Sequence, residues 1–175
     1  MSPCLIVYYS RTGVTAKAAT TLARACGADL EQIQDVSPRG GAGGFLRSAW
    51  QALRKSPAEI VPPLHHPAHY PFVVLGTPVW AGRMSAPMRS YILQQREHFR
   101  RVAVFCTMGG RNGQDVLTSM AELCNQLPVA SMCLRQRDVL EDRCAQALAD
   151  FAGELAIVQH EAHADAAPDP AGHPV

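Results

Sequence analysis

Apolar and polar positions divide the chain into short apolar runs separated by longer amphipathic stretches. Four of the runs, at residues 5–9, 72–76, 101–106 and 129–134, are apolar at most positions, and each contains Val. Runs of this length are typical of strands that are buried on both faces of a sheet. A fifth segment, at residues 29–34, alternates apolar with polar residues, as a half-exposed edge strand does. The pattern therefore predicts five strands.

Between these runs, apolar residues recur every three or four positions, which is the period of an amphipathic helix. Gly27 is placed to end the first helix, and Ser85 and Asn112 are placed to cap the starts of two later ones. We expect helices at 14–26, 45–55, 86–98, 113–126 and 139–158. The folded domain then covers residues 1–159, and we expect residues 160–175, which are rich in Ala, Asp, His and Pro, to form a mobile tail.

Strands and helices alternate along the chain, and this order indicates an α/β fold. A parallel sheet with helices on both faces accounts for it, because consecutive parallel strands need crossover connections. Five such strands fit the doubly wound order 2-1-3-4-5, that is, a three-layer sandwich. In that order a ligand binds beyond the carboxyl ends of strands 1, 3 and 4, where the direction of winding reverses. Three loops are therefore the candidates for a binding site.

The first of these loops opens the helix at 14–26. It consists of Ser10, Arg11, Thr12, Gly13, Val14 and Thr15, most of which carry a hydroxyl or no side chain. Free backbone N–H groups and the positive end of the helix dipole meet there, which favours an anion and especially a phosphate. The loop has neither the Lys of the triphosphate-binding loop nor the G-x-G-x-x-G of dinucleotide-binding folds. Its neutral donors suit a phosphate monoester; the alternative is an ordinary helix N-cap.

The second loop follows the strand at 72–76 and contains Trp80, two residues before Gly82. An indole at this position can stack on a large flat ring, which contributes ~0.5–1.5 kcal/mol beyond the burial of area. The alternative is that Trp80 is an ordinary core residue. The third loop, at residues 107–113, offers Met108 and three glycines, so that backbone amides can approach a ligand closely.

The first two loops resemble two motifs of the flavodoxin family. Residues 10–15 match the Ser/Thr-x-Thr-Gly-x-Thr sequence that holds the FMN phosphate in that family, and residues 77–82 match its Thr-Pro-x-aromatic-x-Gly loop for the isoalloxazine ring. The resemblance extends over residues 5–151 and implies a short-chain flavodoxin-like protein with non-covalently bound FMN. It implies cofactor contacts at Ser10, Arg11, Thr12, Gly13, Val14, Thr15, Thr77, Pro78, Val79, Trp80, Ala81, Gly82, Thr107, Met108, Gly109 and Gly110.

Composition narrows the classes of function. The net charge of +1 provides no basic field for nucleic acid. No apolar run is long enough to span a membrane, and we expect no leader peptide and a cytoplasmic location. The six cysteines form no C-x-x-C pair and fall in apolar segments, which predicts reduced, buried thiols. His65, His66 and His69 lack a cysteine or a well-placed carboxylate nearby, so we predict no metal site.

The sequence leaves two functions open for a flavodoxin-like protein. An electron carrier needs a redox partner protein and an exposed flavin edge, but no catalytic side chain. A reductase that transfers hydride from NAD(P)H to a quinone or a flavin needs an open flavin face, which a second subunit often completes. The family resemblance favours the carrier, as a monomer or a homodimer. Arg83, Arg111 and the absence of a second aromatic beside Met108 favour the reductase.

Two further alternatives concern single segments. A response-regulator-like domain shares the strand order but needs a phosphorylatable Asp after the third strand, where this chain has Thr77 and Pro78, so we exclude it. The predicted helix at 45–55 carries Trp50 and follows several glycines. It either packs on the sheet or forms a movable wall over the flavin.

Overall fold

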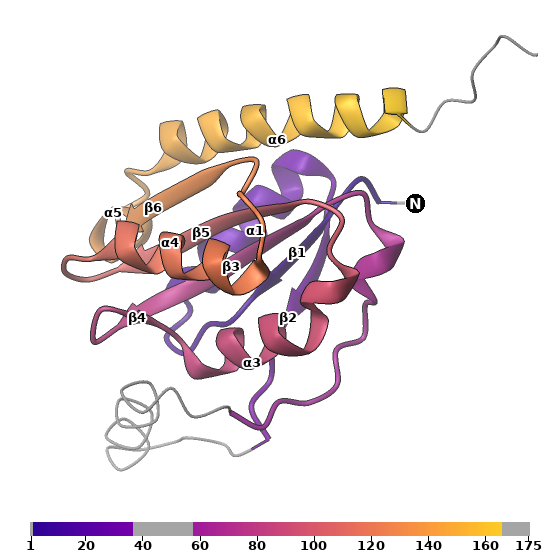
Figure 1. Ribbon diagram of the computed structural model, residues 1–175. Helices are drawn as coiled ribbons and strands as arrows, with labels where there is room; N and C mark the ends of the chain where they lie inside the picture. Colours follow the sequence, from indigo (N-terminus) through magenta and orange to yellow (C-terminus); the bar gives the residue numbers. More distant parts are fainter. Residues whose placement is uncertain (1, 37–57, 166–175) are drawn as a thin grey trace, which may run out of the picture.

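The computed structural model describes residues 2–36 and 58–165, which form a sheet between two layers of helices (Figure 1). Within this part of the chain the sheet has six strands, and five of them are parallel in the order β2-β1-β3-β5-β6. These five are β1 (Leu5–Tyr8), β2 (Asp29–Gln32), β3 (Val73–Trp80), β5 (Val102–Met108) and β6 (Ser131–Arg135). The predicted α/β fold and its doubly wound order are confirmed.

The helices cover both faces of the sheet. Figure 1 shows α1 and α6 together on one face and α3 and α4 on the other. The α-helices of the described residues are α1 (Val14–Cys26), α3 (Ala86–Gln95), α4 (Gly113–Cys124), α5 (Gln136–Leu140) and α6 (Ala145–Asp165). The same residues include the short 3-10 helices η1 (Pro67–His69) and η2 (Arg96–His98). The helix expected at 45–55 lies outside the described residues. None of the described helices is both long enough and apolar enough to cross a membrane.

Strand β1 lies inside the sheet, and all four of its residues are buried. It pairs in parallel with β2 on one side and with β3 on the other, so that Leu5 is level with both Asp29 and Val73. Alternate side chains enter different cores, because successive residues of a strand point to opposite faces. Leu5 belongs to the core under α3 and α4, whereas Ile6 belongs to the core under α1 and α6.

Helix α1 has the predicted bounds. Its apolar residues, such as Leu22, are spaced to face the sheet, and Leu22 has no exposed surface. Gly27 follows in the left-handed conformation with a φ of 62°, and its N–H donates to the carbonyl of Ala23. A residue with a side chain would be strained there, which is why glycine ends the helix.

Strand β3 extends four residues beyond the predicted strand at 72–76. Thr77 and Pro78 continue the parallel ladder opposite Cys106 and Thr107 of β5. Val79 and Trp80 then pair antiparallel with β4 (Arg83–Met84). The predicted open loop is therefore a β-hairpin, which the sequence pattern does not reveal because β4 has only two residues.

The predicted helix at 139–158 is interrupted. Helix α5 ends at Leu140, and α6 begins only at Ala145. Asp142 adopts a positive φ of 56°, a conformation that a regular helix cannot contain. Leu140, near the start of the predicted helix, is 55% exposed, whereas Leu148, Phe151, Leu155 and Val158, three or four residues apart, are buried. Helix α6 continues to Asp165, past the expected start of the tail at residue 160.

Smaller differences affect the helix caps and the edge strands. Strand β2 ends at Gln32 instead of residue 34, and β6 begins at Ser131 instead of residue 129. Ser85 caps α3 as predicted, since its hydroxyl accepts from the N–H of Met88. Asn112 precedes α4 as predicted, but it makes no side-chain capping bond and instead has a φ of 70°.

The histidine-rich segment packs against the edge of the sheet. His65 lies beside the buried Glu31, with 2.5 Å between Nδ1 and a carboxylate oxygen. Glu31 also accepts from the backbone N–H groups of Leu64 and His65, at 3.1 and 3.2 Å. These bonds satisfy a carboxylate that would otherwise be costly to bury. Among residues 2–36 and 58–165, no group of three His, Cys, Asp or Glu side chains is arranged to hold a metal ion.

The cysteines are free, but they are not equally buried. Cys4, Cys106, Cys124 and Cys144 are buried, whereas Cys26 and Cys133 are only partly covered. Burial raises the pKa of the Cys124 thiol to about 12 and has the same effect on Cys4, so both stay protonated at neutral pH. The prediction that the thiols are buried is wrong for two of the six.

Close packing at Gly76 provides a test of the sheet. A Cβ atom at this position would overlap the ring of Phe105, the residue opposite it on β5. We expect Gly76→Ala to lower the free energy of unfolding by about 1–3 kcal/mol, because the fully buried ring has little room to move. Urea denaturation measures the change.

Gly153→Ala is the control, since nothing lies near that exposed position in α6 and alanine should stabilise the helix by about 0.5–1 kcal/mol. Equal stability of Gly76→Ala and wild type would contradict the packing.

Candidate functional site

The loops that follow β1, β3 and β5 meet at the carboxyl edge of the sheet. The hydroxyls of Thr15, in the first loop, and Thr107, in the third, are 2.8 Å apart and buried. The ring of Trp80, at the end of β3, meets the ring of Tyr9 edge to face at a centroid distance of 5.7 Å. In Figure 1 the β3–β4 hairpin and the loop into α4 lie at the left, opposite the amino terminus. The three predicted loops therefore form one site.

The first loop presents an uncapped helix terminus. Gly13 precedes α1 with a φ of 85°, and no side chain of the described residues caps the helix. The first turn contains no acidic residue, and the N–H of Lys17 is the first to bond back, to Gly13 at 2.9 Å. The preceding N–H groups point out of the helix, where the helix dipole favours negative charge.

Ser10 adds a second donor at the same place. Its Oγ atom is buried, and within the described chain it has no hydrogen-bond partner. A buried hydroxyl without a partner is costly, and a ligand that bonded to it would remove that cost. The hydroxyl, together with the free N–H groups of α1, fits a phosphate monoester. The fit rests on neutral donors, as the sequence suggested.

The other residues of the first loop divide into two groups. Thr12 and Gly13 are exposed and Arg11 is half-buried, so these three can contact a ligand from the surface. Val14 and Thr15 are buried, at 4% and 1% exposure. Val14 packs in the core and offers its backbone only. The hydroxyl of Thr15 joins the first loop to Thr107.

The hairpin presents Trp80 at the edge of the sheet. Pro78, Val79 and Trp80 are half-buried, and Ala81 and Gly82 form a two-residue turn between Trp80 and Arg83. Both turn residues have positive φ, 48° and 71°, as in the type I′ turns of tight hairpins. Alanine is strained in that region by about 1–2 kcal/mol, so the hairpin pairing must hold it there.

Thr77 has a supporting role in this structure. Its side chain is fully buried, and its hydroxyl accepts from the N–H of Ser85 at 3.0 Å and lies 3.1 Å from the Ser85 hydroxyl. These bonds connect the hairpin to the start of α3. Thr77 can therefore reach a ligand only through its backbone.

The third loop is open to solvent. Thr107 is buried, Met108 is half-buried, and Gly109 and Gly110 are exposed. A Cβ atom at Gly82 would lie 3.5 Å from the side-chain amide of Asn112, so this loop runs beside the hairpin tip. The described part of the third loop has no aromatic side chain that could face Trp80 across a ligand.

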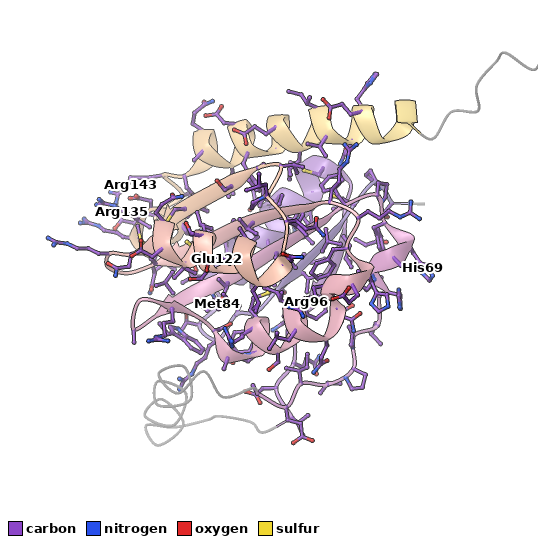
Figure 2. The ribbon with its side chains drawn as sticks, viewed as in Figure 1. His69, Met84, Arg96, Glu122, Arg135 and Arg143 are labelled. Carbon is purple, nitrogen blue, oxygen red and sulfur yellow. The ribbon has the colours of Figure 1, made fainter. Side chains whose placement is uncertain are left out.

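The sequence interpretation missed three residues at this edge. Tyr9, at the end of β1, supports Trp80. Arg135 ends β6 beside Met108, and a Cβ atom at Gly109 would lie 3.6 Å from Oε1 of Gln136. Figure 2 shows Arg135 on the side of the molecule that carries the hairpin, far from His69. The parallel order could have indicated Arg135 and Gln136, because the end of β6 reaches the same edge.

The charge around the site is positive. Arg83, Arg111 and Arg135 are exposed in or beside the second and third loops. No Asp or Glu residue occurs in the three segments 10–15, 77–85 and 107–112. The edge therefore favours anionic molecules over cationic ones.

Comparison with protein families agrees with this geometry. A family model described as flavodoxin matches residues 3–151, which is most of the chain. The chain belongs to the flavodoxin family. A separate comparison with individual curated proteins gave no match.

Solved structures of other proteins share the flavodoxin fold. A flavoprotein from Lactobacillus acidophilus NCFM, solved in complex with FMN, has a TM-score of 0.61 and 20% identity, with 81% of this chain and 98% of that chain covered. A flavodoxin, WrbA-like protein from Agrobacterium tumefaciens has a TM-score of 0.59 and 16% identity, with 94% and 99% covered. The Flv1 flavodiiron core from Synechocystis sp. PCC6803 has a TM-score of 0.51 and 15% identity, with 88% of this chain and 36% of that chain covered. At these identities the likeness concerns the fold.

The Thr15–Thr107 hydrogen bond of this flavodoxin-family site should contribute to the stability of the protein. Replacing either threonine with valine leaves the other hydroxyl buried without a partner, which should lower the free energy of unfolding by about 1–3 kcal/mol. The double variant should lose less than the sum of the two, because it removes both polar groups. Urea denaturation of the wild type, the two single variants and the double variant measures this coupling.

Thr118→Val, at an exposed position in α4, is the control and should change the free energy of unfolding by less than about 0.5 kcal/mol. Strictly additive effects would contradict the contact.

Proposed function

We propose that this protein binds FMN non-covalently at the carboxyl edge of the sheet and carries electrons through it. The observation that carries the proposal is the buried Ser10 hydroxyl, which has no partner among the described residues and lies at the uncapped start of α1. The L. acidophilus flavoprotein, with the same fold, was solved in complex with FMN. FMN ends in a phosphate monoester, the group that this turn fits.

Each loop has a distinct role in the proposed site. Ser10, Thr12 and the N–H groups at the start of α1 would hold the phosphate. Trp80 would stack on the ring, with Tyr9 holding the indole at the sheet edge. The backbone of residues 107–110 would approach the polar edge of the ring. When bound, FMN supplies the redox chemistry, and these residues bind and orient it.

The carrier function agrees with the composition of the loops. The segments at 10–15, 77–82 and 107–110 contain no His, Lys, Cys, Asp or Glu, so they provide no acid or base for a substrate reaction. An electron carrier needs only an exposed ring edge and a surface for its redox partner. The six free thiols, all in the described part of the chain, favour a reducing compartment such as the cytoplasm.

A reductase is the second candidate, and two observations favour it. The exposed Gly109 and Gly110 leave one side of the proposed ring position open to a second molecule. The exposed Arg83, Arg111 and Arg135 would attract the phosphates of NADPH. A nicotinamide that stacked on the open side could transfer hydride to FMN directly.

A binding experiment tests the FMN site. We expect one FMN per chain, and we expect riboflavin, which lacks the phosphate, to bind much more weakly. Ser10→Ala should weaken FMN binding by about tenfold or more, because a hydrogen bond to a charged group contributes about 1.5–3 kcal/mol. The same substitution should leave riboflavin binding unchanged. Quenching of flavin fluorescence measures all four affinities.

Thr21→Ala is the matched control, since this threonine lies on the exposed side of α1 and bonds only to the carbonyl of Lys17 in the described structure. It should bind FMN as the wild type does. Equal affinity of the wild type for FMN and riboflavin would refute a phosphate site at Ser10.

Rapid mixing with NADPH separates the carrier from the reductase. For a carrier, we expect the absorbance of bound FMN to fall slowly under anaerobic conditions, and to fall quickly only when a reducing partner protein is added. For a reductase, NADPH alone bleaches the flavin within the turnover time of an enzyme. In that case Arg111→Gln should slow the bleaching by NADPH more than the bleaching by NADH. Fast bleaching by NADPH would replace the carrier function with the second candidate.

A further inference from the structure

Two cysteines occupy paired positions on neighbouring strands just beneath the third loop. Cys106 of β5 lies directly opposite Cys133 of β6 in the parallel ladder. Their Sγ atoms are 3.4 Å apart. Paired residues on adjacent strands are separated by about 4.8 Å, which lies inside the roughly 4.4–6.8 Å between the Cα atoms of disulfide-bonded cysteines. The two sulfurs can therefore form a bond without a rearrangement of the strands.

This sulfur pair also supports the start of α4. The Cys106 thiol donates weakly to the carbonyl oxygen of Gly113, the first residue of that helix, at 3.6 Å. A Cβ atom at Gly113 would overlap Cys133 Sγ and would lie 2.9 Å from Met108 Sδ. Only glycine allows this approach, so the junction between the third loop and α4 rests on the two thiols.

The two thiols differ in their access to solvent. Cys106 has no exposed surface, and burial, followed by its hydrogen bond with Cys133, raises the pKa of its thiol. Cys133 lies on the edge strand β6 and is partly exposed. Cys133 is therefore the thiol that an oxidant in solution reaches first, and Cys106 is placed to react with it afterwards.

We propose that Cys106 and Cys133 form a reversible oxidation site, at which a hydroperoxide converts the two thiols into a disulfide and thereby weakens FMN binding. The first half of this proposal rests on the cysteine geometry alone. The second half rests also on the proposed function, because the third loop is part of the proposed FMN site.

The reaction has two steps and needs only the hydroperoxide as oxidant. The Cys133 thiol gives up its proton, its sulfur attacks one peroxide oxygen, and the O–O bond breaks. The leaving alkoxide or hydroxide takes up that proton and departs as an alcohol or water, so that Cys133 becomes a sulfenic acid. The Cys106 sulfur then attacks the Cys133 sulfur, and the S–O bond breaks. The departing hydroxide takes the proton of the Cys106 thiol and leaves as water. In total the two thiols lose two electrons and two protons, and the hydroperoxide becomes an alcohol and water.

The disulfide changes the support of the third loop. The two sulfurs must approach from 3.4 Å to about 2.05 Å. The Cys106 thiol also loses its hydrogen, so its bond to the Gly113 carbonyl disappears. Because Gly113 immediately follows the loop at 107–112, we expect these residues to move and FMN to dissociate more easily.

The experiment uses the full chain with FMN bound and hydrogen peroxide as the oxidant. After treatment, free thiols are blocked, and the protein is digested and analysed by mass spectrometry. We expect a peptide pair joined through Cys106 and Cys133, an affinity for FMN about tenfold lower than that of the reduced protein, and recovery of both thiols and affinity with dithiothreitol.

Two variants complete the test. Cys133→Ser replaces a partly exposed residue and should fold, and its FMN affinity should not change with peroxide. Cys26→Ser removes the other partly exposed cysteine and should respond as the wild type does. A peptide map without the Cys106–Cys133 link overturns the oxidation site. A disulfide that leaves FMN affinity unchanged overturns its coupling to the ligand.

These results are distinct from a failure of the proposed function. If the reduced wild type binds no FMN, the proposed function fails and the coupling fails with it. The peptide map still decides in that case whether the oxidation site exists.

Discussion

The position of β1 between two parallel neighbours determines where the site can form. All four residues of β1 are buried, and the strand bonds to β2 on one side and to β3 on the other. Its carboxyl end therefore lies between those of β2 and β3, at the point where the connections turn to opposite faces of the sheet. The turn that follows β1 must lie between the hairpin after β3 and the start of α1. A hydroxyl-rich sequence placed there becomes a polar site at the edge of a packed core.

Two contacts connect the loops of this site across long distances in the sequence. The Thr15–Thr107 hydrogen bond fixes the first loop against the third, and the contact between Tyr9 and Trp80 fixes the first against the second. Three of the four residues lie at or just beyond strand ends that the sheet already places close together, and Thr15 lies in the first turn of α1. Little further order is then needed when a ligand binds, which favours affinity. The loops are less constrained at Gly109 and Gly110, the exposed part of the site.

The elements that depend on local pattern could be predicted from the sequence, and those that depend on tertiary pairing could not. Residues 5–9 form a continuous apolar run, residues 14–26 have a helical period, and Gly27 ends the helix through its own conformational freedom. The strand β4 has two residues and pairs only because β3 extends to Trp80. The break at 141–144 depends on the positive φ of Asp142, which apolar spacing does not indicate. Likewise, the motif resemblance suggested a ligand contact for Thr77, whereas its full burial follows from the start of α3.

The placement of α6 has a consequence for the synthesis of the chain. The core beneath α1 and α6 is completed by Cys144, Leu148, Phe151, Leu155 and Val158, which leave the ribosome after every strand of the described sheet. Until then, only α1 can cover that side of the sheet, while the other side can already be covered by α3 and α4. Nascent chains of this protein are therefore most exposed to misassembly, or to a chaperone, on the face that carries Ile6 and Phe105.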